Sequence, residues 1–173
     1  MTRALILVDI QNDYFHGGLW PVDDMAHVAQ NAARVLATAR EEGQMIVHIR
    51  HEATSQAAPF FRPGTSGAEI HTSVAPIAGE KVILKHRPNS FHETSLHQDL
   101  QAAGITELTI IGAMTQMCID ATTRAARDFG YEVTLIADAC GAKAVSFGGT
   151  DLTAAQVQAA YLSALGMSYA KVI

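Results

Sequence analysis

Residues 108–136 read LTIIGAMTQMCIDATTRAARDFGYEVTLI, and this stretch decides the fold. The segment 108–114 is largely apolar and β-branched, which is typical of a strand covered on both faces. An alanine-rich segment follows Cys118 and is predicted to be a helix that ends near Gly130. A second apolar segment, 131–136, is predicted to be the next strand. A strand, a helix and a strand in this order predict a parallel βαβ unit.

The same alternation extends over the rest of the chain. We expect further strands at residues 4–8, 45–49, 82–84 and 170–172, helices at residues 24–42, 94–103 and 152–165, and a loop rich in Pro, Gly and Ser at 53–67. Strands that alternate with helices predict a parallel sheet between helical layers, built of right-handed crossovers. A length of 173 residues suits a single domain, residues 1–173.

Composition excludes several classes of function. The chain is 49% hydrophobic and 17% charged, which argues against disorder. Its formal net charge of −5, with no cluster of Lys and Arg, argues against a nucleic-acid partner. We expect neither a membrane span nor a signal peptide, because no apolar run is long enough to span a membrane and the first predicted strand begins at Ala4. The two cysteines do not make a disulfide framework, so we expect a cytoplasmic protein that acts on a small molecule.

Three reactive residues lie where predicted strands end or just beyond: Asp9, Lys85 and Cys118. In parallel sheets, ligands bind beyond the carboxyl ends of the strands. The topology can therefore bring these three side chains together, although they are far apart in the sequence. A thiol, a carboxyl group and an ammonium group are the components of a cysteine hydrolase.

Each of these residues has an expected role. Cys118 lies where a helix is predicted to begin, and the helix dipole there favours the thiolate. Asp9 is the best proton carrier, because burial beside an apolar strand is expected to raise the pKa of its carboxyl group. Lys85 would supply the positive charge that favours the thiolate. The backbone N–H groups of Met114 and Cys118 are the expected donors to the oxyanion.

The chain resembles the isochorismatase-like cysteine hydrolases, the group that includes nicotinamidases and carbamoylsarcosine amidases. The resemblance covers essentially the whole length and rests on residues 7–13 (LVDIQND), on Lys85 with Ser90-Phe91, on residues 112–118 (GAMTQMC), and on residues 122–126 (TTRAA) with Gly130-Tyr131. It implies an Asp9–Lys85–Cys118 catalytic triad and a six-stranded, mainly parallel, doubly wound sheet of Rossmann-like type. It also implies a cis peptide bond between Ala113 and Met114, and assembly into homo-oligomers.

The same resemblance bears on the chemistry. Members that hydrolyse the vinyl ether of isochorismate commonly lack the cysteine, so Cys118 favours attack on an amide-like bond. The nicotinamidase branch carries a metal on an Asp-x-His motif after the second strand, where this chain has Ile49-Arg50-His51-Glu52. We therefore expect no metal and no cofactor, and nicotinamide becomes a less favoured substrate.

Three functions stay open at this point. The leading one is a cysteine amidohydrolase that forms a thioester with a small amide or related acyl compound. The others are vinyl ether hydrolysis by Asp9 without covalent catalysis, and a binding protein of the same fold without turnover. Candidate substrate contacts are Gln11, Phe15, Trp20, Arg50, His51, Phe91, Thr115 and Gln116, whereas Phe60, Phe61 and Cys140 are expected to serve packing.

Overall fold

A six-stranded parallel sheet forms the centre of the molecule. A computed structural model of the chain describes residues 2–173. The strands are β1 (Arg3–Val8), β2 (Met45–His51), β3 (Lys81–Lys85), β4 (Glu107–Ala113), β5 (Glu132–Gly141) and β8 (Lys171–Val172). They lie in the order β3-β2-β1-β4-β5-β8, and each neighbouring pair is parallel. Because the strand order turns at β1 and β4, the switch point lies between these two strands.

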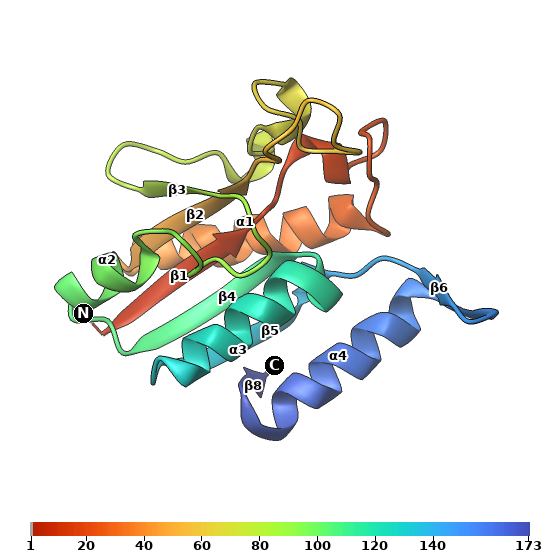
Figure 1. Ribbon diagram of the computed structural model, residues 1–173. Coiled ribbons are helices and arrows are strands. Elements are labelled where there is room, and N and C mark those ends of the chain that lie inside the picture. Colours follow the sequence, from red (N-terminus) through yellow and green to blue (C-terminus); the bar gives the residue numbers. More distant parts are fainter. Residues whose placement is uncertain (1) are drawn as a thin grey trace.

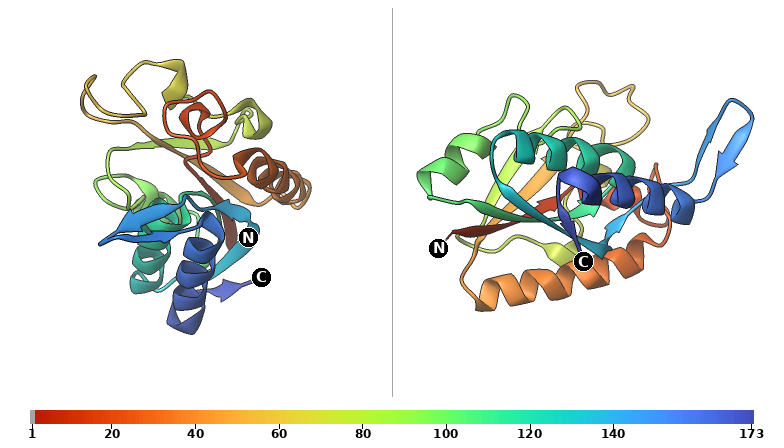
Figure 2. Two further views of the ribbon diagram at one scale, coloured as in Figure 1. Left: turned by 90° about the vertical axis from the view of Figure 1, so that its right-hand side faces the viewer. Right: turned by 90° about the horizontal axis from the view of Figure 1, so that it is seen from below.

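Helices cover the sheet on both faces, as predicted (Figures 1 and 2). Helix α1 (Met25–Glu41) lies on one face, and α2 (Leu96–Ala102), α3 (Asp120–Asp128) and α4 (Ala154–Ser168) lie on the other. Each face has its own buried core: Leu36 of α1 packs in one, and Leu100 and Leu165 of α2 and α4 pack in the other. The predicted three-layer α/β/α fold is confirmed.

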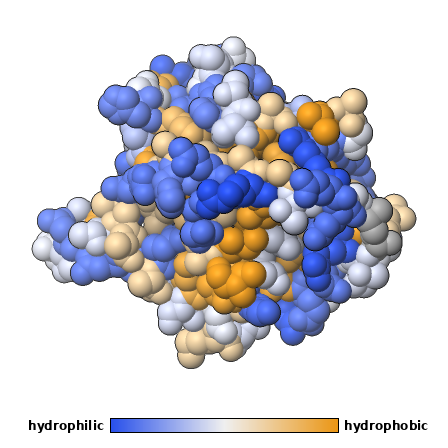
Figure 3. Space-filling view, turned by 180° about the vertical axis from the view of Figure 1, so that it is seen from behind, coloured by the Kyte–Doolittle hydropathy of each residue, from blue (hydrophilic) through white to orange (hydrophobic). Residues whose placement is uncertain are grey.

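The α1 face of the sheet carries a shallow groove. It has a volume of about 370 Å³ and is lined in part by Leu5, Val35, Ile136 and Ile173. Seen from behind, an apolar area lies among hydrophilic side chains (Figure 3).

No helix of residues 2–173 is both long enough and apolar enough to cross a membrane.

A two-stranded antiparallel hairpin projects from the body and is absent from the sequence prediction. It consists of β6 (Val145–Phe147) and β7 (Thr150–Leu152) (Figures 1 and 2). Both strands are exposed, so no alternation of buried and exposed residues marks them in the sequence. Gly148 and Gly149 form the tip of this hairpin and have positive φ angles.

Gly112 allows β4 to lie close to β1. Its φ angle is +129°, and a Cβ atom added there would overlap the carbonyl oxygen of Val8. We expect Gly112→Ala to lower the free energy of unfolding by about 3 kcal/mol, measured by urea denaturation. Gly130→Ala is the matched control, because Gly130 also has a positive φ, +91°, but a Cβ atom added there would meet no neighbouring group within 4 Å. An equal loss in both variants would contradict a steric role for Gly112.

Candidate active site

The structure brings Asp9, Lys85 and Cys118 into one buried cluster. Asp9 follows β1, Lys85 ends β3, and Cys118 lies in a π-helical turn, η4 (Thr115–Ile119), that follows β4. The Nζ atom of Lys85 lies 2.9 Å from Oδ2 of Asp9. A carboxylate oxygen of Asp9, a ring nitrogen of His51 and the sulfur of Cys118 lie within 4.8 Å of one another. Asp9, Lys85 and Cys118 are nearly inaccessible to solvent, at 0%, 1% and 3% exposure.

The backbone around the cluster has two unusual features. Asp9 adopts a left-handed conformation with a φ angle of +52°, which aspartate tolerates better than most residues. Its N–H donates to the carbonyl oxygen of Ile49 at 3.1 Å, which ties the end of β1 to β2. The peptide bond between Ala113 and Met114 is cis, the geometry that the resemblance implies.

Asp9 and Lys85 form a buried ion pair. Burial alone would raise the pKa of Asp9, but the Lys85 ammonium, together with the nearby His51 and Cys118 side chains, outweighs it and holds this pKa below its usual value. Burial likewise opposes the charge on Lys85, yet the negative charge of Asp9 raises the pKa of Lys85. The expectation of a raised Asp9 pKa is therefore wrong, because it considered burial without the cation.

Cys118 rests as a thiol. Burial raises the pKa of Cys118, the charge of Asp9 raises it further, and Lys85 only partly opposes them. The expected thiolate is therefore wrong for the free protein. Cys118 lies in the π-helical η4 turn, which runs directly into α3, so it is in the first turn of the helical segment, as expected. A thiol beside a carboxylate is arranged so that the carboxylate can take the thiol proton.

His51 joins the cluster, and Gln11 holds it in place. The Nδ1 atom of His51 lies 3.8 Å from Oδ2 of Asp9. Gln11 accepts a hydrogen bond from the N–H of His51 at 2.7 Å and donates to the carbonyl oxygens of His51 and Ala68 at 2.8 and 2.7 Å. Gln11 is fully buried, and both polar atoms of its side chain are bonded to backbone. Its geometry fits a positioning role better than the predicted substrate contact.

The same cluster contains three residue types that bind metals. Asp9, His51 and Cys118 form the one such convergent group found among residues 2–173. The ammonium of Lys85, 2.9 Å from Asp9, opposes a cation at this place. Ile49 stands where the nicotinamidase motif has its Asp and offers no ligand atom. The residues therefore do not fit the metal of that branch.

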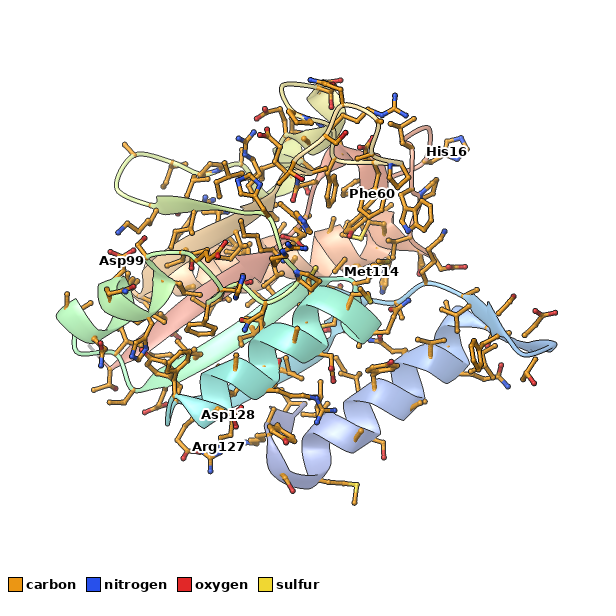
Figure 4. The ribbon with its side chains drawn as sticks, in the orientation of Figure 1. His16, Phe60, Asp99, Met114, Arg127 and Asp128 are labelled. Atoms are coloured by element: carbon orange, nitrogen blue, oxygen red, sulfur yellow. The ribbon has the colours of Figure 1, made fainter. Side chains whose placement is uncertain are left out.

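An aromatic wall connects the cluster to the surface. Tyr14 packs on Phe61 at 4.6 Å between ring centroids, and Phe61 lies 5.8 Å from the ring of His51. Phe60 packs on Phe61 at 4.9 Å and stacks on Trp20 at 5.0 Å. The wall borders a pocket of about 300 Å³, which we call the mouth pocket; it is lined by Trp20, Phe60, Met114, Gln116, Met117, Lys143 and residues 144–145. Figure 4 shows its residues Phe60 and Met114 beyond the carboxyl ends of the strands.

Several predicted contacts lie elsewhere. Phe15 stacks on His71 at 3.7 Å beside a separate polar pocket formed by the loops around residues 12–19 and 62–71. Arg50 pairs with Glu69 and Glu52. Phe91 packs in the core near Phe129 and Tyr131.

The other predicted substrate contacts lie in or near the mouth pocket. Thr115 is fully buried, and its hydroxyl has no hydrogen-bond partner within residues 2–173. Trp20 and Gln116 line the mouth pocket. Phe60, expected to serve packing, lines it as well, and so do Met117 and Lys143, which were not predicted from the sequence. A lysine in a loop carries no pattern that separates it from a solvated one, so the sequence offered no signal for Lys143.

Comparison with known proteins identifies the family. The model of the isochorismatase domain matches residues 3–164. The chain belongs to the isochorismatase family. The predicted resemblance is therefore confirmed over nearly the whole chain.

Individual relatives agree with this assignment. The chain is 42% identical over 172 residues to the isochorismatase family protein YddQ of Bacillus subtilis strain 168, and the match covers 99% of this chain and 96% of that protein. It is 31% identical over 153 residues to a maleamate amidohydrolase of Pseudomonas putida, covering 80% of this chain and 71% of that protein. A crystal structure from Oleispira antarctica, provisionally assigned as an isochorismatase hydrolase, has a TM-score of 0.96 at 49% identity and covers 99% of this chain and 92% of that one. The chain is a hydrolase of a family whose members include enzymes that act on amide C–N bonds.

Proposed function

We propose that this hydrolase cleaves a small amide or related acyl compound through a thioester on Cys118. The observation that carries the proposal is the position of the Cys118 sulfur, within 4.8 Å of a carboxylate oxygen of Asp9, which is paired with Lys85 in the same buried cluster. A carboxylate that is kept ionised by a cation can accept the thiol proton at neutral pH. The maleamate amidohydrolase similarity supports an amide substrate.

Acylation begins when Asp9 takes the proton of the Cys118 thiol. The sulfur attacks the carbonyl carbon of the substrate, and a C–S bond forms while the carbonyl oxygen gains negative charge. The backbone N–H groups of Met114 and Cys118 stabilise this oxyanion. When the C–N bond breaks, Asp9 gives its proton to the leaving amine, and a thioester remains.

Deacylation uses the same carboxylate. Asp9 accepts a proton from water, the resulting hydroxide attacks the thioester carbon, and the C–S bond breaks. The proton returns to the sulfur, which restores the thiol, and the acid product leaves. Lys85 holds Asp9 ionised between the two halves of the reaction.

A screen of substrates tests this proposal. We expect the wild type to release ammonia or an amine from at least one member of a panel of amides, lactams and carbamoyl compounds, and Cys118→Ser to release none. A vinyl ether belongs in the same panel. Hydrolysis of the vinyl ether by both proteins would favour Asp9 catalysis without a thioester, and no turnover of any compound would favour a binding protein.

We also propose a setting for the reaction, on the basis of the free cysteines. Both Cys118 and Cys140 are unpaired, and a reducing cytoplasm keeps Cys118 available as a nucleophile. Cytoplasmic location and homo-oligomeric assembly stay predictions. Size-exclusion chromatography with light scattering measures the second of these directly.

A further inference from the structure

The mouth pocket is apolar and neutral except for one cation, Lys143. Lys143 follows β5, which ends at Gly141, and precedes β6 of the hairpin. Aromatic and thioether side chains of Trp20, Phe60 and Met114 line the same pocket. A single charge in an apolar pocket is typical of a group that orients a ligand.

The backbone of Lys143 is bonded to the turn that carries Cys118. The side-chain amide of Gln116 donates to the carbonyl oxygen of Lys143 at 2.9 Å and accepts from its N–H at 3.4 Å. Gln116 lies two residues before Cys118 in the same η4 turn. The η4 turn therefore carries both the thiol and the side chain that bonds the backbone of Lys143.

The charge of Lys143 has no carboxylate partner within the part of the chain that the structure describes. Its ammonium group donates to the carbonyl oxygen of Pro21 and lies 5.6 Å from the ring centroid of Trp20. The carboxylate of Asp23 accepts from the neighbouring N–H of Ala144 instead. An ammonium group has three N–H donors, so donors remain for a ligand anion after the bond to Pro21.

We propose that Lys143 binds a carboxylate of the substrate. This inference rests on the proposed function, because it assumes that the scissile amide lies at Cys118. The substrate class is then a short acid amide with the amide at one end and a free carboxylate at the other. The apolar side chains of Trp20, Phe60 and Met114 contact the carbon chain between the two groups. A pocket of about 300 Å³ limits this chain to a small molecule.

Protection of Cys118 from alkylation by iodoacetamide tests the proposal. Amido acids of four to six carbons are compared with the diamides of equal length, and mass spectrometry of tryptic peptides separates Cys118 from Cys140. In the wild type we expect the amido acid that fits best to protect Cys118 at about 10-fold lower concentration than the diamide of the same length. Lys143→Met should remove this difference, and Lys143→Arg should retain it. Lys171→Met, a change of an exposed lysine on β8, is the control and should behave as wild type.

Steady-state kinetics on any amido acid that is hydrolysed gives a second readout. Lys143→Met should raise KM about 10-fold and leave kcat nearly unchanged, because the carboxylate contact is remote from the reacting bond. Equal protection by acid and diamide in the wild type, no protection by either, or a preference that survives Lys143→Met would overturn the assignment. A preference that depends on Lys143 without any hydrolysis would instead leave the assignment standing and count against the proposed catalytic function.

Discussion

Replacing Cys118 by alanine is expected to lower kcat/KM for the amide substrate by about 10⁴-fold or more, because no other group in the cluster can form the thioester. The free energy of unfolding should change by no more than about 1 kcal/mol, since the change removes one sulfur atom from a small buried side chain. Activity is measured by release of ammonia or amine, and stability by urea denaturation.

The matched control is Cys140→Ala. Cys140 is equally buried, at 3% exposure, but lies on β5, and burial raises the pKa of its thiol to about 12. We expect this variant to keep its activity. If Cys118→Ala kept more than a tenth of the wild-type activity, covalent catalysis by Cys118 would be excluded.

Replacing Lys85 by methionine is expected to lower the free energy of unfolding by about 3–5 kcal/mol and to abolish hydrolysis. The change leaves the carboxylate of Asp9 buried without its cation, which costs much more than the pair itself contributes. The double variant Asp9→Asn with Lys85→Met should recover most of the lost stability, because no buried charge remains, but none of the activity. Denaturation of the wild type, Lys85→Met, Asp9→Asn and the double variant at pH 7 gives the coupling between the two residues.

In the Lys85→Met variant, the contribution of Asp9 to stability should change with pH in the opposite direction to that in the wild type. In the wild type the pKa of Asp9 lies below the ordinary value of 3.8, so its contribution is present above that pH and is lost as the pH falls. Without Lys85, burial raises the pKa of Asp9, and the folded state binds the proton more tightly than the unfolded state. Lys85→Met should therefore lose stability as the pH rises above about 4. A loss that is equal at pH 4 and pH 7 would contradict this origin of the effect.

The parts of the fold that were predicted correctly are those with strong local patterns. The apolar runs of β1, β2 and β4 are buried on both faces, and burial of that kind leaves an unbroken hydrophobic segment in the sequence. The ends of β1 and β3 then placed Asp9 and Lys85 at one edge of the sheet. The β6–β7 hairpin was missed because its residues are exposed and its pattern resembles a loop.

The errors in the site have one physical cause, which is that they depend on contacts between distant segments. The pKa directions of Asp9 and Cys118 follow from the field of Lys85 and from burial together, and no local pattern contains both. Phe91 was expected in the pocket but packs against Phe129, which lies at the end of α3. Lys143 could be recognised as a pocket residue only from the structure, in which it lies beside Gln116 and Trp20 in the lining of the mouth pocket.

Turnover of an amide substrate in the presence of hydroxylamine tests the thioester most directly. Hydroxylamine competes with water for an acyl group on Cys118, so we predict that the wild type forms the hydroxamate in proportion to the hydroxylamine concentration, and that Cys118→Ala forms none. Release of the free acid alone at every hydroxylamine concentration, at an undiminished rate, would contradict a thioester on Cys118.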